Sequence, residues 1–180
     1  MKTAALLFVA LLPLAAQDFV IPASIDRLAS KAKSVVDVNL DGSLLQLAAR
    51  FLSDRDADEV QVKKLVSGLK GIFVKSFEFD NRGEYLESDV EGLRSQLRGP
   101  GWSRIVGVKS QRSGDNADIY LKSDSTQITG LVVLVAEPRQ LTIVSINGPI
   151  NPDDIRNLGG HFGIPKLDGT VIRKDKRKED

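Results

Sequence analysis

The chain contains no cysteine and only one histidine, His161. Without cysteine the protein has no disulfide, and the lipid anchor of a bacterial lipoprotein, which is attached to cysteine, is excluded. Closed zinc sites are built mainly from cysteine and histidine, so such a site is excluded as well. A Ser-His-Asp triad would have to use His161, and no Gly-x-Ser-x-Gly motif accompanies it. We therefore predict no metal site, no cofactor and no catalytic residue.

Nucleotide-binding glycine motifs are absent too, both the Walker type and the Gly-x-Gly-x-x-Gly type. The segment 37–42 matches the opening of an EF-hand calcium loop, with oxygen-bearing side chains at alternate positions and Gly42 at the sixth. The position that should carry a bidentate glutamate is Ala48, so the loop offers too few oxygens for calcium. We interpret this segment as the junction of a strand and a helix.

Neither sign of charge predominates, since 25 lysine and arginine residues stand against 24 aspartates and glutamates. The residues 173–180 hold five of the basic and three of the acidic side chains and no apolar one, which predicts a disordered, charged tail. The rest of the chain is slightly acidic and offers no basic face for nucleic acid. We predict no nucleic-acid partner.

Long apolar runs are scarce. The one over residues 4–16 follows Lys2 and is shorter than the roughly 20 residues of a membrane span. A basic start, a short apolar run and a small-residue exit are typical of a cleavable signal peptide. We predict a signal peptide over 1–16, cut after Ala16 or one residue to either side, and export to the periplasm or the exterior. No membrane span would remain after cleavage; an uncleaved N-terminal anchor is the alternative.

Helical spacing dominates the residues that follow the predicted signal peptide. Pro22 opens a segment in which Ile25, Leu28 and Ala32 recur at helical intervals. The segment 35–40 has the composition of a short strand.

Two more helices are predicted before the main sheet. Ser43 would cap the first, whose apolar side would carry Leu44, Leu47, Ala48, Phe51 and Leu52. Acidic residues over 54–58 would open the other, since negative charge favours a helix N-terminus. That helix would run to about Gly68. Its buried residues would be Val60, Leu65 and Leu69.

The rest of the sequence alternates strand and helix signals. Residues 72–79 are rich in β-branched and aromatic side chains and predict a strand. Ser88 and Glu91 form a capping box that would start a helix, which Pro100 and its flanking glycines would end. Four further strands are predicted over 103–109, 117–122, 128–136 and 140–147.

Short polar turns join these four strands, which predicts an antiparallel meander. The apolar run 131–135 indicates a central strand covered on both faces. Asn151 and Pro152 would start a last helix. The fold class predicted for residues 17–172 is a single α+β domain, in which about three helices precede a mainly antiparallel sheet of order β-α-β-β-β-β-α.

Two residues suggest an interaction surface. Trp102, the only tryptophan, lies in a glycine-proline turn two residues before Arg104. An aromatic side chain beside an arginine can anchor a partner; the alternative is a ring that closes the core at the sheet edge. Acidic residues at 78, 80, 84 and 87 offer a second hypothesis, a carboxylate pair such as glycosidases use.

Three segments resemble a bacterial envelope family known only as a domain of unknown function (DUF4252). They are residues 69–79, 101–108 and 144–150, and the resemblance extends over about 19–167. Many members of that family look like lipoproteins, and the missing cysteine implies a soluble form here. The resemblance implies no activity and no site residues.

The residues and the resemblance together favour an exported, non-enzymatic binding or protein-interaction module of the cell envelope. Its partner would be an unknown envelope protein or a small ligand. A small carboxylate-dependent hydrolase is the first alternative, and a small-molecule or lipid carrier with an apolar cavity is the second.

Overall fold

The computed structural model describes residues 18–151. The predicted signal peptide, the helix predicted after Asn151 and the charged tail lie outside the described residues. No helix in the described range combines the length and the apolar character that a membrane crossing requires.

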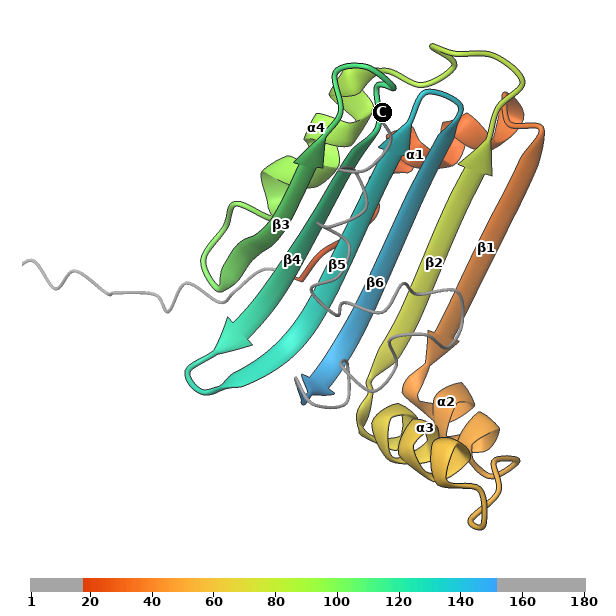
Figure 1. The fold of residues 1–180 in the computed structure, drawn as a ribbon, viewed down its shortest axis with the longest axis vertical. Helices are drawn as coiled ribbons and strands as arrows, with labels where there is room; N and C mark the ends of the chain where they lie inside the picture. The colour runs from red at the N-terminus through yellow and green to blue at the C-terminus, as the bar shows by residue number, and fades with distance from the viewer. Residues whose placement is uncertain (1–17, 152–180) are drawn as a thin grey trace, which may run out of the picture.

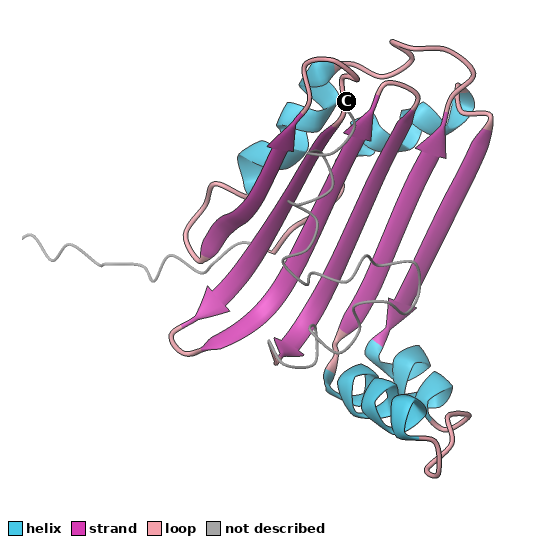
Figure 2. Ribbon diagram, viewed as in Figure 1, coloured by secondary structure: helices cyan, strands magenta, loops and turns pink. Residues whose placement is uncertain are grey.

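Six strands form one antiparallel sheet in the order β1-β2-β6-β5-β4-β3 (Figures 1 and 2). The α+β class is therefore confirmed, and the five strands predicted from residue 72 onward are present to within a few residues. The strands are β1 (Ser34–Asp41), β2 (Gly71–Glu78), β3 (Trp102–Lys109), β4 (Asn116–Asp124), β5 (Gln127–Glu137) and β6 (Gln140–Ile150). The helices are α1 (Ala23–Asp26), the 3-10 helix η1 (Arg27–Ser30), α2 (Gly42–Ala49), α3 (Ala57–Gly68) and α4 (Glu87–Gln96).

The predicted order of elements was wrong at the start of the sheet, because β1 belongs to it. This strand pairs with β2 along its whole length, from Ser34 opposite Glu78 to Asp41 opposite Gly71. Helices α2 and α3 separate the two strands in the sequence, so no short turn signals the pairing. Strand β2 then pairs with β6, the last of the described strands in the sequence.

The main core lies between one face of the sheet and the helices α1, η1 and α4, which lie together behind the sheet in Figure 1. Every second residue of β5 and β6 points into it, as the strand period of two requires. Its most completely buried members, each at most 1% exposed, are Ile25, Phe77, Val90, Leu93, Val132, Leu134, Leu141 and Ile143.

Helix α2 is capped by Asp41 and not by Ser43 as predicted. The Asp41 carboxylate accepts a hydrogen bond from the backbone N–H of Leu44 at 2.9 Å, and the Ser43 hydroxyl donates to the same oxygen. Together these hydrogen bonds lower the pKa of Asp41. The aspartate holds this position because the strand ends there in an extended conformation, as an N-cap needs.

The buried side of α2 also differs from the prediction. Leu45 and Ala49 are buried, at 2% and 4% exposure, whereas Phe51 is 83% exposed. Helices α2 and α3 form a hairpin at one end of the sheet, and only a narrow strip of α2 meets a small second cluster around Leu69 and Ile150. Residues of the predicted apolar sides that are instead exposed are Leu44, Leu47 and Val60.

Helix α4 begins one residue before the predicted cap. Leu86 is its N-cap, and its backbone N–H donates to the Asp89 carboxylate at 2.9 Å. The predicted pair Ser88 and Glu91 does not cap the helix. Glu91 instead forms an ion pair with Arg98 on the helix surface.

Tyr85 connects the loop before α4 to the sheet, and its titration is expected to lower the stability of the protein at alkaline pH. Its hydroxyl donates to the backbone carbonyl of Glu137 at 2.5 Å, and its ring lies 5.7 Å from that of Phe79. Burial, with smaller contributions from Glu87 and Glu137, raises the pKa of Tyr85 to about 12. In the unfolded chain a tyrosine titrates near pH 10, at about its ordinary value.

Between these two pKa values the unfolded state releases a proton that the folded state retains, so stability falls as the pH rises from about 10 to about 12. Urea unfolding across this range is expected to show a shallower decline for Tyr85→Phe than for the parent protein. Burial also raises the pKa of Tyr120, the other tyrosine of the chain, so Tyr120→Phe is the comparison and is expected to remove its own share of the decline. Identical slopes for the parent and Tyr85→Phe would contradict the assignment.

Candidate functional site

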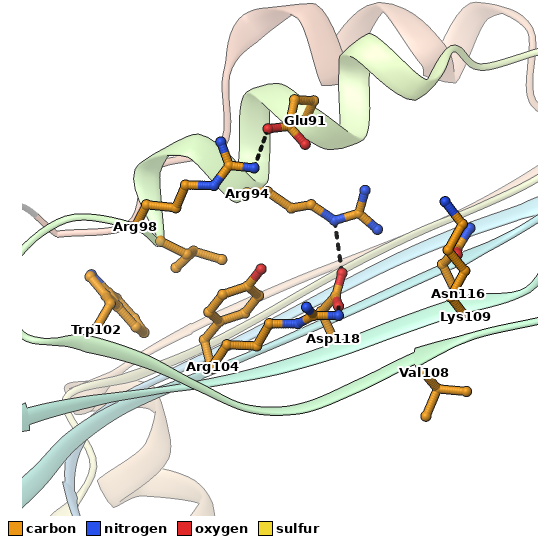
Figure 3. A pocket seen from close by; sticks show the side chains of 11 residues that line it. Glu91, Arg94, Arg98, Trp102, Arg104, Val108, Lys109, Asn116 and Asp118 are labelled. Carbon is orange, nitrogen blue, oxygen red and sulfur yellow. Dashed lines mark hydrogen bonds and ion pairs between the residues drawn. The ribbon is translucent and has the colours of Figure 1, made fainter.

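A groove of about 520 Å³ lies between α4 and the strands β3 and β4 (Figure 3). Helix α4 forms its upper wall in this view, and the two strands form its floor. Its lining is mainly polar, with four cationic and two anionic side chains. The residues that line it are Glu91, Arg94, Leu97, Arg98, Trp102, Arg104, Val108, Lys109, Asn116, Asp118 and Tyr120.

A β-bulge in β3 places Arg104 in this groove. The register between β3 and β4 slips after Arg104, which leaves Ile105 without a partner. As a result Arg104 lies opposite Tyr120 and Gly107 lies opposite Asp118 on the same face. A Cβ atom at Gly107 would stand 2.0 Å from the Arg104 guanidinium. The guanidinium therefore occupies the space that any larger residue at position 107 would need.

Asp118 is the buried anion at the centre of the groove, with a side chain 1% exposed. The Nε of Arg94 donates to Oδ2 of Asp118 at 2.8 Å. On the other side, Nη2 of Arg104 lies 2.5 Å from Oδ1 of Asp118, as an ion pair without hydrogen-bond alignment. Asp118 thus joins a guanidinium from α4 to one from β3 (Figure 3).

Arg94 is held from two sides. Its Nη1 donates to Glu87 at 2.7 Å, in addition to the hydrogen bond with Asp118. Burial opposes its charge, but the hydrogen bonds to Asp118 and Glu87 outweigh this effect and raise the pKa of the Arg94 guanidinium. Arg94 therefore stays charged and fixed, while Arg104, with a side chain 52% exposed, presents its other nitrogens to solvent.

Trp102 lines one end of the groove and also packs against the core. Its ring packs against the main core cluster, and the ammonium group of Lys122 lies 5.8 Å from the ring centroid. Its Nε1 is buried and has no hydrogen-bond partner in the described part of the chain. The structure thus brings Trp102 and Arg104 to one groove; that they bind a partner stays a prediction.

Sequence reasoning missed Arg94, Asp118 and Gly107. One signal was present, because Asp118 sits inside a predicted strand, where a charged residue must either face solvent or find a buried partner. The apolar neighbours Ala117 and Ile119 favour a solvent-facing Asp118, so local alternation indicated the opposite of the burial that the structure shows.

The carboxylates of the hydrolase hypothesis are Glu78, Asp80, Glu84 and Glu87. Glu78 and Asp80 line a second pocket, of about 490 Å³, together with Lys33 and Arg139. Glu87 instead pairs with Arg94, which lines the first groove. The four acidic side chains therefore do not gather at one site, although Glu78 and Asp80 share the second pocket.

The acidic residues of the EF-hand-like segment 37–42 have structural roles in β1 and at the start of α2. Asp37 lies in β1, where its carboxylate is 3.1 Å from the ammonium group of Lys75, and Asp41 caps α2. The interpretation as a strand–helix junction is confirmed.

No curated protein matches the chain. The family model described as Domain of unknown function (DUF4252) matches residues 29–158. This range includes all six strands and helix α4, and therefore the groove. The family description names no activity and assigns no residue a role. Because the match covers well over half of the chain, the protein belongs to the DUF4252 family.

Proposed function

We propose that the protein is an exported, non-enzymatic binding module and that the α4–β3–β4 groove binds an acidic peptide segment of a partner protein. The observation that carries this proposal is the arrangement of Arg104. Its guanidinium is held across Gly107 by the buried Asp118, yet half of the side chain is open to solvent. A planar guanidinium held in this way suits a carboxylate, which it can bind through two parallel hydrogen bonds.

Fixing the arginine in advance favours binding. Ordering a free, rotamer-rich side chain on binding costs about 0.5–1.5 kcal/mol, and the contact with Asp118 removes part of that cost. Arg98 and Lys109 extend the cationic surface toward the two ends of the groove (Figure 3). Trp102 adds an aromatic surface at one of these ends, and aromatic and arginine side chains are enriched where partners bind strongly.

The two alternative functions have less support. A carrier would need an apolar cavity between the helices and the sheet beside the 131–135 run. At that place Val132 and Leu134 are 0% and 1% exposed and belong to the packed core. A carboxylate-dependent hydrolase would need two free carboxylates on either side of a bound substrate. Glu78 and Asp80 share one pocket, but Glu78 pairs with Lys33 there, and Glu87 pairs with Arg94 elsewhere.

Titration with a hexaglutamate peptide, followed by the fluorescence of Trp102, tests the proposal. We expect saturable binding that weakens as salt is added, because exposed charges are screened, and no binding of hexalysine. The Arg104→Ala variant is expected to bind about 10-fold or more weakly, since a hydrogen bond to a charged group contributes about 1.5–3 kcal/mol.

Arg112→Ala is the matched control, because it removes the same charge from an exposed position outside the groove lining. It should leave the affinity for hexaglutamate unchanged. Equal affinities for the parent protein, Arg104→Ala and Arg112→Ala would overturn the proposal.

The Gly107→Ala variant tests the same groove without removing a charge. Its methyl group would displace the flexible end of Arg104 from Asp118 and leave the backbone in place. We expect weaker binding of hexaglutamate with nearly unchanged urea unfolding. Gly92→Ala in α4 is the control, because a Cβ there meets no atom within 4 Å. Unaltered binding by Gly107→Ala would show that the position of Arg104 is not needed.

Export is part of the proposal and has its own test. Expression of the full chain followed by N-terminal sequencing of the protein from the extracytoplasmic fraction should give a start at Gln17, or one residue to either side. A chain lacking residues 2–16 should remain in the cytosol. Recovery of the intact chain, with Met1 still attached, from the cytosol would disprove export.

A further inference from the structure

The sheet has a second apolar face, opposite α1 and α4. One row of β-branched side chains crosses all six strands in register on this face. Its members are Val38, Val74, Val144, Val133, Ile119 and Val106. The first five are partly exposed or exposed, and Val106 is 38% exposed.

This face differs from the solvent face of an ordinary antiparallel sheet. Where one side of such a sheet meets water, its strands alternate between apolar and polar residues. Here the row next to the first also contains apolar residues, among them Leu40, Ile146 and Leu131. Among the described elements no helix lies over the middle of this face, which is turned toward the viewer in Figure 2. The α2–α3 hairpin meets the face only at one end, where Leu45 and Val66 belong to the second cluster with Ile146.

The central position predicted for β5 is confirmed, and its second face is partly exposed at Leu131, Val133 and Val135. That this second face is covered stays a prediction.

An apolar patch of this extent marks a surface that another segment or molecule covers, because monomeric soluble proteins rarely expose more than a few hundred Å² of continuous apolar surface. The candidates are the C-terminal part of the chain, a second copy of it, or a lipid surface. Three observations favour the first.

The chain leaves the last strand on this face. Ile150, the final residue of β6, is 5% exposed and packs in a cluster with Leu131 and Ile146, which both belong to the apolar face. Strand β6 is also third of the six strands in the sheet order. The chain therefore leaves the sheet near the middle of its width, at one end of the strands.

The residues that follow have the composition of a covering segment. Asn151 and Pro152 are a helix-start signal. The apolar residues after it are Ile155, Leu158, Phe162, Ile164 and Leu167. The family match extends to residue 158, beyond the end of β6, so the start of this segment belongs to the same family domain as the sheet.

The segment is also long enough. Six strands about 4.8 Å apart make a sheet roughly 24 Å wide. A helix over 152–159 would span about 12 Å at 1.5 Å per residue. The residues from 160 to 167, at about 3.3 Å each when extended, would span more than the remaining width of the sheet. We propose that residues 152–167 fold back over the open face and cover its β-branched row. This proposal does not rest on the function assigned to the groove.

Engineered disulfides in the full chain test the proposal, because the protein has no cysteine of its own. Leu158→Cys is combined in turn with Val133→Cys, Val144→Cys and Val74→Cys. Under mild oxidation we expect at least one pair to form an intramolecular disulfide in most molecules, since this requires Cβ atoms within about 4.5 Å. Leu158→Cys with Ser88→Cys is the matched control, because Ser88 is exposed on α4 at the opposite face.

Circular dichroism establishes that each variant is folded, and non-reducing mass spectrometry identifies the linkage. Intramolecular disulfides at the open face that exceed those of the Ser88 control support the proposal. Disulfide-linked dimers, together with a dimer mass in light scattering, would overturn it in favour of a second copy. Binding of the parent chain to phosphatidylcholine vesicles, without an intramolecular disulfide, would overturn it in favour of a lipid surface.

Discussion

Replacing Phe77 by alanine is expected to reduce the free energy of unfolding by about 3–5 kcal/mol, as truncation of a buried phenylalanine does elsewhere. Phe77 is 0% exposed and lies on the covered face of β2, and its ring is 6.4 Å from that of Phe79. The substitution removes the apolar contacts of the ring and leaves a cavity in the main core. Native domains have only about 5–15 kcal/mol of net stability, so the loss is a large part of the total.

Urea unfolding followed by far-ultraviolet circular dichroism measures this effect. Phe51→Ala is the matched control, because it makes the same change at a residue that is 83% exposed. Its effect should stay within about 0.5 kcal/mol. If both variants unfolded at the same urea concentration, the placement of the main core on this face of β2 would be wrong.

The second large effect is expected for Asp118→Ala, which should cost about 3 kcal/mol. Removal of one partner from a buried ion pair costs about 3–5 kcal/mol, because the other charge is left buried without compensation. Here the Arg94 side chain is 16% exposed and would lose its hydrogen bond to Asp118. The lower end of the range applies because Arg94 keeps its contact with Glu87 and Arg104 is half exposed.

Glu91→Ala provides the comparison for Asp118→Ala. Glu91 also pairs with an arginine of the groove, but both side chains of that pair are largely exposed, at 45% and 65%. An exposed pair contributes about 0–1 kcal/mol. Both variants can be followed by urea unfolding with circular dichroism. Equal losses of stability in the two variants would show that Asp118 is not the buried anchor of the groove.

The contrast between Asp118 and Glu91 illustrates where sequence reasoning stopped for the candidate site. Trp102 and Arg104 could be selected from residue type and from their position at a turn. The network that holds Arg104 could not, because it depends on the bulge at Ile105 and on the pairing of Gly107 with Asp118. Register between strands is a property of the assembled sheet.

Helix α2 shows the same limit for the fold. Its sequence carries apolar residues on more than one side, so Leu44 and Leu47 were as good candidates for burial as Leu45 and Ala49. Local spacing establishes that such a segment forms a helix, but neighbours in space select its buried side. The second cluster, with Leu69 and Ile150, makes that selection for Leu45.

The amino-acid sequence by itself determined the α+β class, the five strands from residue 72 onward and the helix before β3, because these depend on local periodicity and turn residues. Its lack of cysteine also determined that no disulfide stabilises the fold. Only the tertiary structure decided that β1 joins the sheet at its edge, that Arg94 and Arg104 converge on Asp118, and that among the described elements helices cover the middle of the sheet on one face only. These features depend on contacts between residues distant in the sequence, which local patterns do not encode.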